Sequence, residues 1–131
     1  MGKENLILDA SYSFALAVIE LARHIRERKE YDLASQLWRS GTSIGANIEE
    51  AQAAQSRADF ISKMAIAAKE ARETRYWLKL TLDSKILASA TVNPLIEDIE
   101  RILRILTSIV KTSSESLPSK IQNPKSKISL P

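Results

Sequence analysis

Residues 37–80 read LWRSGTSIGANIEEAQAAQSRADFISKMAIAAKEARETRYWLKL and contain most of the unusual patterning in the chain. In the first half, Leu37, Ile44 and Ile48 recur on one side of a helix with 3.6 residues per turn. A row of mostly small polar residues borders this stripe, and small polar groups in such a position usually form hydrogen bonds. We therefore predict a hydrogen-bonded structural network here; the alternative is a functional constellation completed by a basic residue of the next helix. The polar row consists of Ser40, Ser43, Asn47 and Glu50.

The second half of the segment predicts a long amphipathic helix. Its stripe alternates at spacings of four and three over Phe60, Met64, Ala67, Ala71, Thr74 and Leu78. The acidic edge beside this stripe consists of Asp59, Glu70 and Glu73, together with Trp77. The basic edge consists of Arg72, Arg75 and Lys79. These cations predict either phosphate contacts or an ion pair with a carboxylate, for which Glu50 is a candidate.

The same segment resembles the bacterial four-helix bundle proteins that include the 23S ribosomal RNA intervening-sequence proteins. The matching positions are Arg39, Ser43, Ile44, Asn47, Ile48, Glu50, Phe60, Ala67, Glu73 and Leu78. The resemblance extends over residues 9–110 and departs from the family pattern at residues 49–51, where many relatives have a glycine after the glutamate. It implies a compact bundle that assembles into a ring, a pentamer, in a family whose biochemical role is poorly defined.

The composition is typical of a helical protein with one domain. The 131 residues are 44% apolar and include three glycines, four prolines and no cysteine, enough for one core without disulfides. Four apolar stripes predict helices at 9–29, 32–54, 57–82 and 94–111. The expected fold is an all-α, antiparallel up-down-up-down four-helix bundle over residues 1–111. A flexible basic tail containing serine and proline is expected over residues 112–131.

Local signals predict where the helices begin. Residues 1–8 are expected to form a short arm before a first helix that Asp9 or Ser11 caps. Ser56 is the predicted cap of the third helix. The dipeptide at 93–94, asparagine then proline, predicts the start of the fourth helix, because proline is favoured at the first helical position.

Gly41, Gly45 and Trp38 are the unusual residues of the second helix. Each glycine inside a helix costs about 1 kcal/mol relative to alanine. The pair therefore predicts that another helix packs closely there; the alternative is a break between two helices. Trp38 lies opposite the core stripe, and an exposed tryptophan is interpreted as a subunit contact rather than as a platform for a base.

The net positive charge is concentrated near the C-terminal end. Residues 1–110 contain 15 Lys plus Arg and 15 Asp plus Glu, whereas residues 111–131 contain four lysines and one glutamate. Nucleic-acid binding would therefore depend on how charges cluster on the bundle, or on the tail. We find neither a signal-like segment nor an apolar run near 18 residues, so a cytoplasmic protein without a membrane span is expected.

The sequence has no recognisable enzyme signature. One histidine cannot supply the paired Glu-x-x-His motifs of a di-iron bundle, and no glycine-rich loop is present to hold a nucleotide. Glu49 and Glu50 point about 100° apart on a helix and so do not form paired carboxylates. We expect no catalytic residues, no metal site, no cofactor and no small-molecule substrate.

Two functional hypotheses remain. The first is a structural or scaffolding homo-oligomer with an unidentified partner. The second is an RNA-binding or nucleic-acid accessory ring, in which a modest basic patch is repeated around a cyclic assembly. The cations that end the first helix also have a structural explanation, since they favourably oppose the helix dipole. The candidate subunit or nucleic-acid contacts are Arg23, Arg26, Arg28, Lys29, Trp38, Arg72, Arg75 and Lys79.

Overall fold

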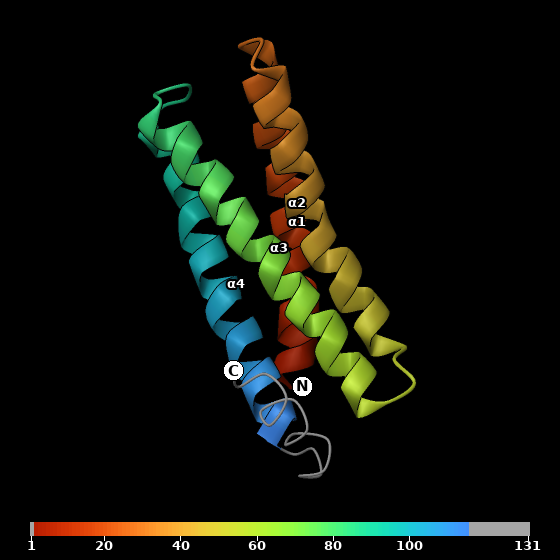
Figure 1. Ribbon diagram of the computed structural model, residues 1–131. Helices are drawn as coiled ribbons and strands as arrows, with labels where there is room; N and C mark the ends of the chain where they lie inside the picture. The colour runs from red at the N-terminus through yellow and green to blue at the C-terminus, as the bar shows by residue number, and fades with distance from the viewer. Residues whose placement is uncertain (1, 116–131) are drawn as a thin grey trace, which may run out of the picture.

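The chain forms an antiparallel four-helix bundle, which confirms the predicted fold class. The computed structural model describes residues 2–115. Its elements are α1 (Lys3–Glu27), α2 (Tyr31–Gln52), α3 (Arg57–Asp83) and α4 (Ser89–Glu115). Figure 1 shows the helices alternating in direction, with the start of α1 and the end of α4 at the same end of the bundle. Both α1 and α3 pack against α2 and α4, so the bundle has four faces, each formed by two neighbouring helices.

One continuous apolar core lies between the helices. Every helix contributes completely buried side chains, such as Val18, Ile44, Leu78 and Ile99. Burying an aliphatic side chain of this size contributes about 1.5–3 kcal/mol. The four predicted stripes face this core, although Phe60 is only half-buried against it. Apolar spacing therefore determines which side of each helix faces inward.

The start of α1 differs from the prediction. Residues 3–8 belong to the helix instead of forming an arm, because Ile7 is completely buried in the core. Ser11, predicted as a possible cap, lies inside the helix and donates a hydrogen bond to the Leu8 carbonyl at 3.1 Å. The spacing from Ile7 to Ser11 and Phe14 continues the inward side of the helix. Tertiary burial here prevails over the capping signal at Asp9.

The start of α4 also differs from the prediction. The helix begins at Ser89, and Pro94 lies inside it rather than at its first position. Val92 is completely buried, so the turn before the proline packs on the core and remains helical. Proline lacks the N–H that would bond the carbonyl of Ala90, but Ala90 is exposed and water can take that place. Glu115 ends the helix four residues into the predicted tail, and residues 116–131 lie outside the described part.

A Schellman motif ends α1 and turns the chain into α2. Lys29 donates its backbone N–H to the Arg26 carbonyl at 2.8 Å, and Glu30 donates to the Ile25 carbonyl at 3.3 Å. Lys29 has a φ of 65°, the left-handed conformation that glycine adopts with least strain. A lysine with a Cβ therefore occupies a position that favours glycine.

We expect Lys29→Gly to stabilise the protein by about 0.5–1 kcal/mol, because glycine relieves the left-handed strain. Lys29→Ala removes the same charge but keeps the Cβ, so it should give no such gain. Urea denaturation of the two variants separates the effects. Equal stability of the glycine and alanine variants would contradict the assignment of strain to this residue.

The two glycines of α2 lie where α1 approaches most closely. A Cβ at Gly41 would lie 2.6 Å from Val18 Cγ1, whereas a Cβ at Gly45 would lie 3.4 Å from Ser11 Oγ. The helix continues through both residues. The predicted close approach of a neighbouring helix is confirmed, and the alternative of a break at the glycines is wrong.

Candidate assembly surfaces

The polar row of α2 provides one hydrogen bond across the core. Ser40 is completely buried, and Thr74 Oγ1 donates to Ser40 Oγ at 2.9 Å. Ser40 Oγ in turn donates to the Leu37 carbonyl at 3.5 Å. This hydroxyl pair joins α2 to α3. Thr74 had been assigned to the apolar stripe, and nothing in the sequence identified it as the partner of Ser40.

The other members of the row bond mainly within α2. Ser43 Oγ donates to the Arg39 carbonyl at 2.7 Å, and Asn47 Nδ2 donates to the Ser43 carbonyl at 2.8 Å. We also predicted from its place beside the core stripe that Asn47 is buried and hydrogen-bonded; the hydrogen bond is confirmed, but the side chain is only half-buried. Glu50 pairs with Lys63 of α3 at 3.3 Å. A basic partner for Glu50 on this helix was predicted, but Lys63 is not one of the three cations of the basic edge, Arg72, Arg75 and Lys79.

The hydroxyl pair can be tested by a double-mutant cycle. Ser40→Ala or Thr74→Val should each destabilise the protein by about 1 kcal/mol, because each leaves the other buried hydroxyl less well satisfied. The double variant should lose less than the sum, with a coupling of at least about 0.5 kcal/mol. Urea denaturation measures all four proteins. Strict additivity would show that the pair does not connect α2 and α3 energetically.

The acidic edge of α3 is satisfied inside the subunit. Arg39 of α2 forms ion pairs with Glu70 at 3.2 Å and with Glu73. Trp77 Nε1 donates to Glu73 Oε2 at 3.0 Å. Helical spacing in the sequence places Glu70, Glu73 and Trp77 on one edge of α3, whereas the family resemblance is the only signal for Arg39. Glu70 and Glu73 therefore form ion pairs across the contact between α2 and α3.

The basic edge of α3 faces α4. Arg75 Nη1 lies 3.0 Å from Glu100 Oε1. One of the three cations of the basic edge therefore has a carboxylate partner on α4. Arg72 and Arg75 line a groove of about 500 Å³ together with Arg104 and Lys111 of α4. The sequence indicated the two α3 residues but not the two from α4, because the rotation of α4 relative to α3 is set only by packing.

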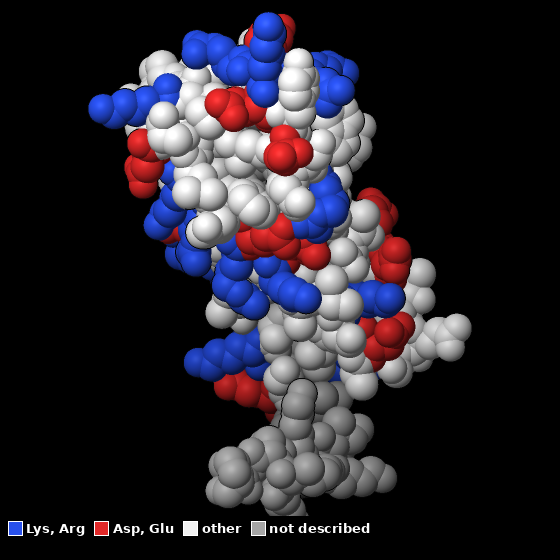
Figure 2. Space-filling view, turned by 45° about the horizontal axis from the view of Figure 1, so that its top comes forward, with Lys and Arg blue, Asp and Glu red and all other residues white. Residues whose placement is uncertain are grey.

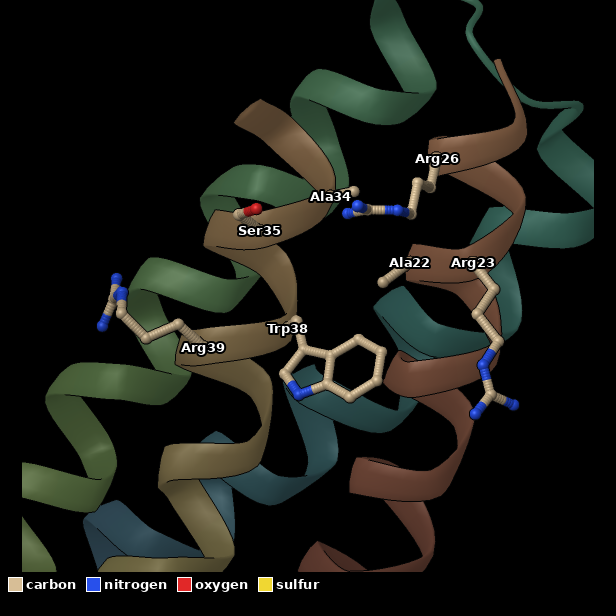
Figure 3. Close-up of a pocket in the computed structure, with 7 residues that line it drawn as sticks. All are labelled: Ala22, Arg23, Arg26, Ala34, Ser35, Trp38 and Arg39. Atoms are coloured by element: carbon tan, nitrogen blue, oxygen red, sulfur yellow. The ribbon is translucent and has the colours of Figure 1, made fainter. Parts of the chain in front are cut away.

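A groove between α1 and α2 contains Trp38. Figure 3 shows the indole leaning across the groove toward α1, with Arg23 and Arg26 extending from α1 beside it. The cavity has a volume of about 510 Å³, and Trp38 is 42% exposed, as the sequence predicted. Arg26 lies over the Tyr31 ring, with its guanidinium carbon 5.4 Å from the ring centroid. The groove is therefore apolar, and Arg23 and Arg26 form a positively charged rim.

The groove continues into an apolar outer side of α1. Tyr12 is 69% exposed and Leu16 is 55% exposed, and their spacing places both on the side of α1 that leads to Arg23. We predicted no apolar run near 18 residues, but the segment Asn5–Glu27, although Asp9 and Glu20 interrupt it, is long and apolar enough to cross a membrane by length and composition alone. A third of its most apolar window is buried in the bundle. The helix thus exposes more apolar surface than one packed core requires. We call this surface, formed by Tyr12, Leu16 and Trp38 with the rim of Arg23 and Arg26, the Trp38 face.

A second apolar groove lies on the adjacent face of the bundle, between α2 and α3. Its volume is about 540 Å³. Leu80 is 39% exposed there, and Asp32 adds a carboxylate at the rim. We call this surface the Leu80 groove. Its lining includes Asp32, Leu33, Gln36, Trp77, Leu80 and Ile86.

Cations also gather at one end of the bundle. Arg28 and Lys29 are exposed where α1 ends. Figure 2 shows Lys and Arg side chains crowded at the top of the view. This end of the bundle carries the connections from α1 to α2 and from α3 to α4. The predicted nucleic-acid contacts therefore fall into separate groups. Within residues 2–115, no group of three or more His, Cys, Asp or Glu side chains could hold a metal ion.

Comparisons with known proteins identify the family. A family model described as 23S rRNA-intervening sequence protein matches residues 3–108. A solved structure of a protein of unknown function, from the S23 ribosomal protein family of Bacteroides thetaiotaomicron VPI-5482, shares 44% sequence identity and has a TM-score of 0.80. That comparison covers 84% of this chain and 99% of the other. A search of curated proteins gave no match. The chain belongs to the 23S rRNA-intervening sequence protein family.

Proposed function

We propose that the protein is a non-enzymatic assembly module that forms a cyclic homo-oligomer, with a structural or scaffolding role. The observation that carries this proposal is a pair of apolar surfaces on adjacent faces of one bundle. The Trp38 face offers exposed aromatic and aliphatic side chains, and the Leu80 groove offers an apolar hollow. Exposed apolar side chains that cluster in this way are typical of sites where proteins associate.

In this assembly, the Trp38 face of one copy of the chain contacts the Leu80 groove of a second copy. A contact between two different faces is heterologous, and repeating it produces a ring when the rotation closes. Adjacent faces of a square bundle are about a quarter-turn apart, which suits a ring of about four or five subunits. The pentamer implied by the family resemblance lies within this range.

Charge complementarity favours the same pairing. Arg23 and Arg26 border the Trp38 face, whereas Asp32 borders the Leu80 groove. Exposed ion pairs contribute only about 0–1 kcal/mol each, so apolar burial must supply most of the affinity. The two charged edges of α3 could also meet between subunits, but Arg39 and Glu100 partly neutralise them within the same chain. We therefore assign assembly to the apolar surfaces.

A complementation experiment tests the heterologous contact. Trp38→Glu should disable one surface and Leu80→Glu the other, so each variant alone should be monomeric. Each keeps one intact surface, so mixing the two should give a dimer of about twice the chain mass by light scattering. Leu6→Glu, an equally drastic change at an exposed residue that lines the groove between α1 and α4, outside both surfaces, should assemble like the unmodified protein.

Three outcomes would contradict the proposal. A mixture that stays monomeric would exclude pairing between these two surfaces. Full assembly of either single variant would show that its surface is not needed. Binding of a monomeric unmodified protein to phospholipid vesicles would instead assign the apolar side of α1 to a membrane surface.

A further inference from the structure

We propose that the groove between α3 and α4 binds the phosphodiester backbone of single-stranded nucleic acid. Four cations line this groove against a single carboxylate, so its side chains carry an excess of three positive charges. Guanidinium groups bind phosphate oxygens through paired N–H donors. The groove has a volume of about 500 Å³, and the residues that carry the charge are Arg72, Arg75, Arg104, Lys111 and Glu100.

The arrangement of the cations suits a linear polyanion better than one isolated phosphate. Arg104 and Lys111 are seven residues apart on α4, and Arg72 and Lys79 are seven apart on α3. Seven residues span about 10 Å of helix. Arg104 and Lys111 thus lie along the α4 side of the groove, and Arg72 and Arg75 line its α3 side, with Lys79 one turn beyond Arg75 on α3. Cations spaced along the bundle axis in this way can contact successive phosphates of one strand. A hydroxyl at Thr107 adds a neutral donor between the α4 cations.

Tyr76 supplies the stacking surface that such a site needs. It lies between Arg72 and Lys79 on the same side of α3, four residues after the first and three before the second. Its side chain is 57% exposed, and its ring meets the Trp77 ring edge-on at 5.1 Å between centroids. Single-stranded nucleic acid is bound by cations that follow the backbone and by aromatic rings that stack on bases. Tyr76 does not line the groove itself, but it lies one helical turn from Arg72, which does.

An acidic protein fits the groove less well. Protein interfaces obtain most of their affinity from apolar or aromatic anchors in desolvated pockets. Leu103, the aliphatic residue that lines this groove, is only 7% exposed, so it offers little surface for such an anchor. The large apolar surfaces lie on other faces, at Trp38 and Leu80.

The inference does not rest on the proposed ring. The groove lies on the face opposite the Trp38 face, and all its lining residues belong to one subunit. A cyclic assembly would repeat it around the ring and increase avidity. A monomer would keep the site with lower overall affinity.

Fluorescence anisotropy with labelled oligouridylate tests the site. We expect binding that weakens steeply as salt rises, because bound counterions are released. The double variant Arg72→Gln/Arg104→Gln should bind at least about tenfold more weakly. The control double variant Arg57→Gln/Arg101→Gln removes the same charge at exposed residues that do not line this groove, and it should stay within about twofold of the unmodified protein. Tyr76→Leu should weaken binding with no change in the salt slope, because it removes stacking and no charge.

The contradicting results are equally specific. Equal losses in the two double variants would show attraction by overall charge instead of a site. Equally tight binding of labelled polyglutamate would assign the groove to acidic proteins, and displacement by inorganic phosphate at low millimolar concentration would assign it to a small anion. No binding of oligouridylate at low salt would remove the inference. Light scattering on the same samples reports assembly separately, so loss of RNA binding and loss of the ring are distinguishable.

Discussion

Replacing Gly41 by alanine should destabilise the protein by about 1–3 kcal/mol, although alanine is normally the better helix residue. The added Cβ would lie 2.6 Å from Val18 Cγ1 and 2.9 Å from Val18 Cγ2. Val18 is completely buried and branched at Cβ, so it has little freedom to move away. The two helices would have to separate along their contact.

Gly45→Ala provides the matched control. Its Cβ would meet Ser11 at ordinary contact distance, so the variant should be neutral or more stable by up to about 1 kcal/mol. Combining Gly41→Ala with Val18→Ala should lose less stability than the two single changes added together, because the smaller side chain makes room for the new methyl group. Urea denaturation measures each variant. Equal stability of Gly41→Ala and Gly45→Ala would contradict the close approach of α1 and α2 at Gly41.

Replacing Leu16 by aspartate should weaken assembly at least about tenfold. Burying the leucine side chain in the interface contributes about 1.5–3 kcal/mol, and the aspartate carboxylate would instead have to lose its water on binding. Tyr12→Asp should act in the same direction. Both residues are exposed in the subunit, so neither change should lower the stability of the isolated bundle by more than about 0.5 kcal/mol. Sedimentation over a range of concentrations gives the change in association.

Leu6→Asp serves as the control for Leu16→Asp. The two leucines have similar exposure, 51% and 55%, but Leu6 lines the groove between α1 and α4, outside both proposed assembly surfaces. The control variant should retain the mass of the unmodified protein. If both leucine variants lose assembly to the same extent, the effect comes from charge in general and the Trp38 face has no special role.

The fold was predictable because every helix carries a strong apolar period. A stripe such as the one through Met64, Ala71 and Leu78 specifies both the helix and its inward side. The ends were less predictable, because a local cap competes with distant burial. Ile7 and Val92 are completely buried, and their packing extends α1 and α4 past the signals at Asp9 and Pro94.

The surfaces were predictable only in part. The exposure of Trp38 and the cap at Ser56, which accepts a hydrogen bond from the Asp59 N–H at 3.0 Å, both follow from local spacing. Pairs between helices do not, since they depend on how far each helix is rotated and shifted against its neighbour. The Ser40 contact with Thr74 and the position of Arg104 beside α3 are set by packing across the core.

The mass of the unmodified protein in solution is the most direct test of the proposed assembly. Light scattering or sedimentation at micromolar concentration and moderate salt should give a mass several times the 14.6 kDa of one chain, with five copies as the expected number. The mass should stay constant as salt rises, because apolar contacts dominate the interface. A mass of 14.6 kDa throughout the micromolar range would contradict the ring and the assignment of the Trp38 face to a second copy of the chain.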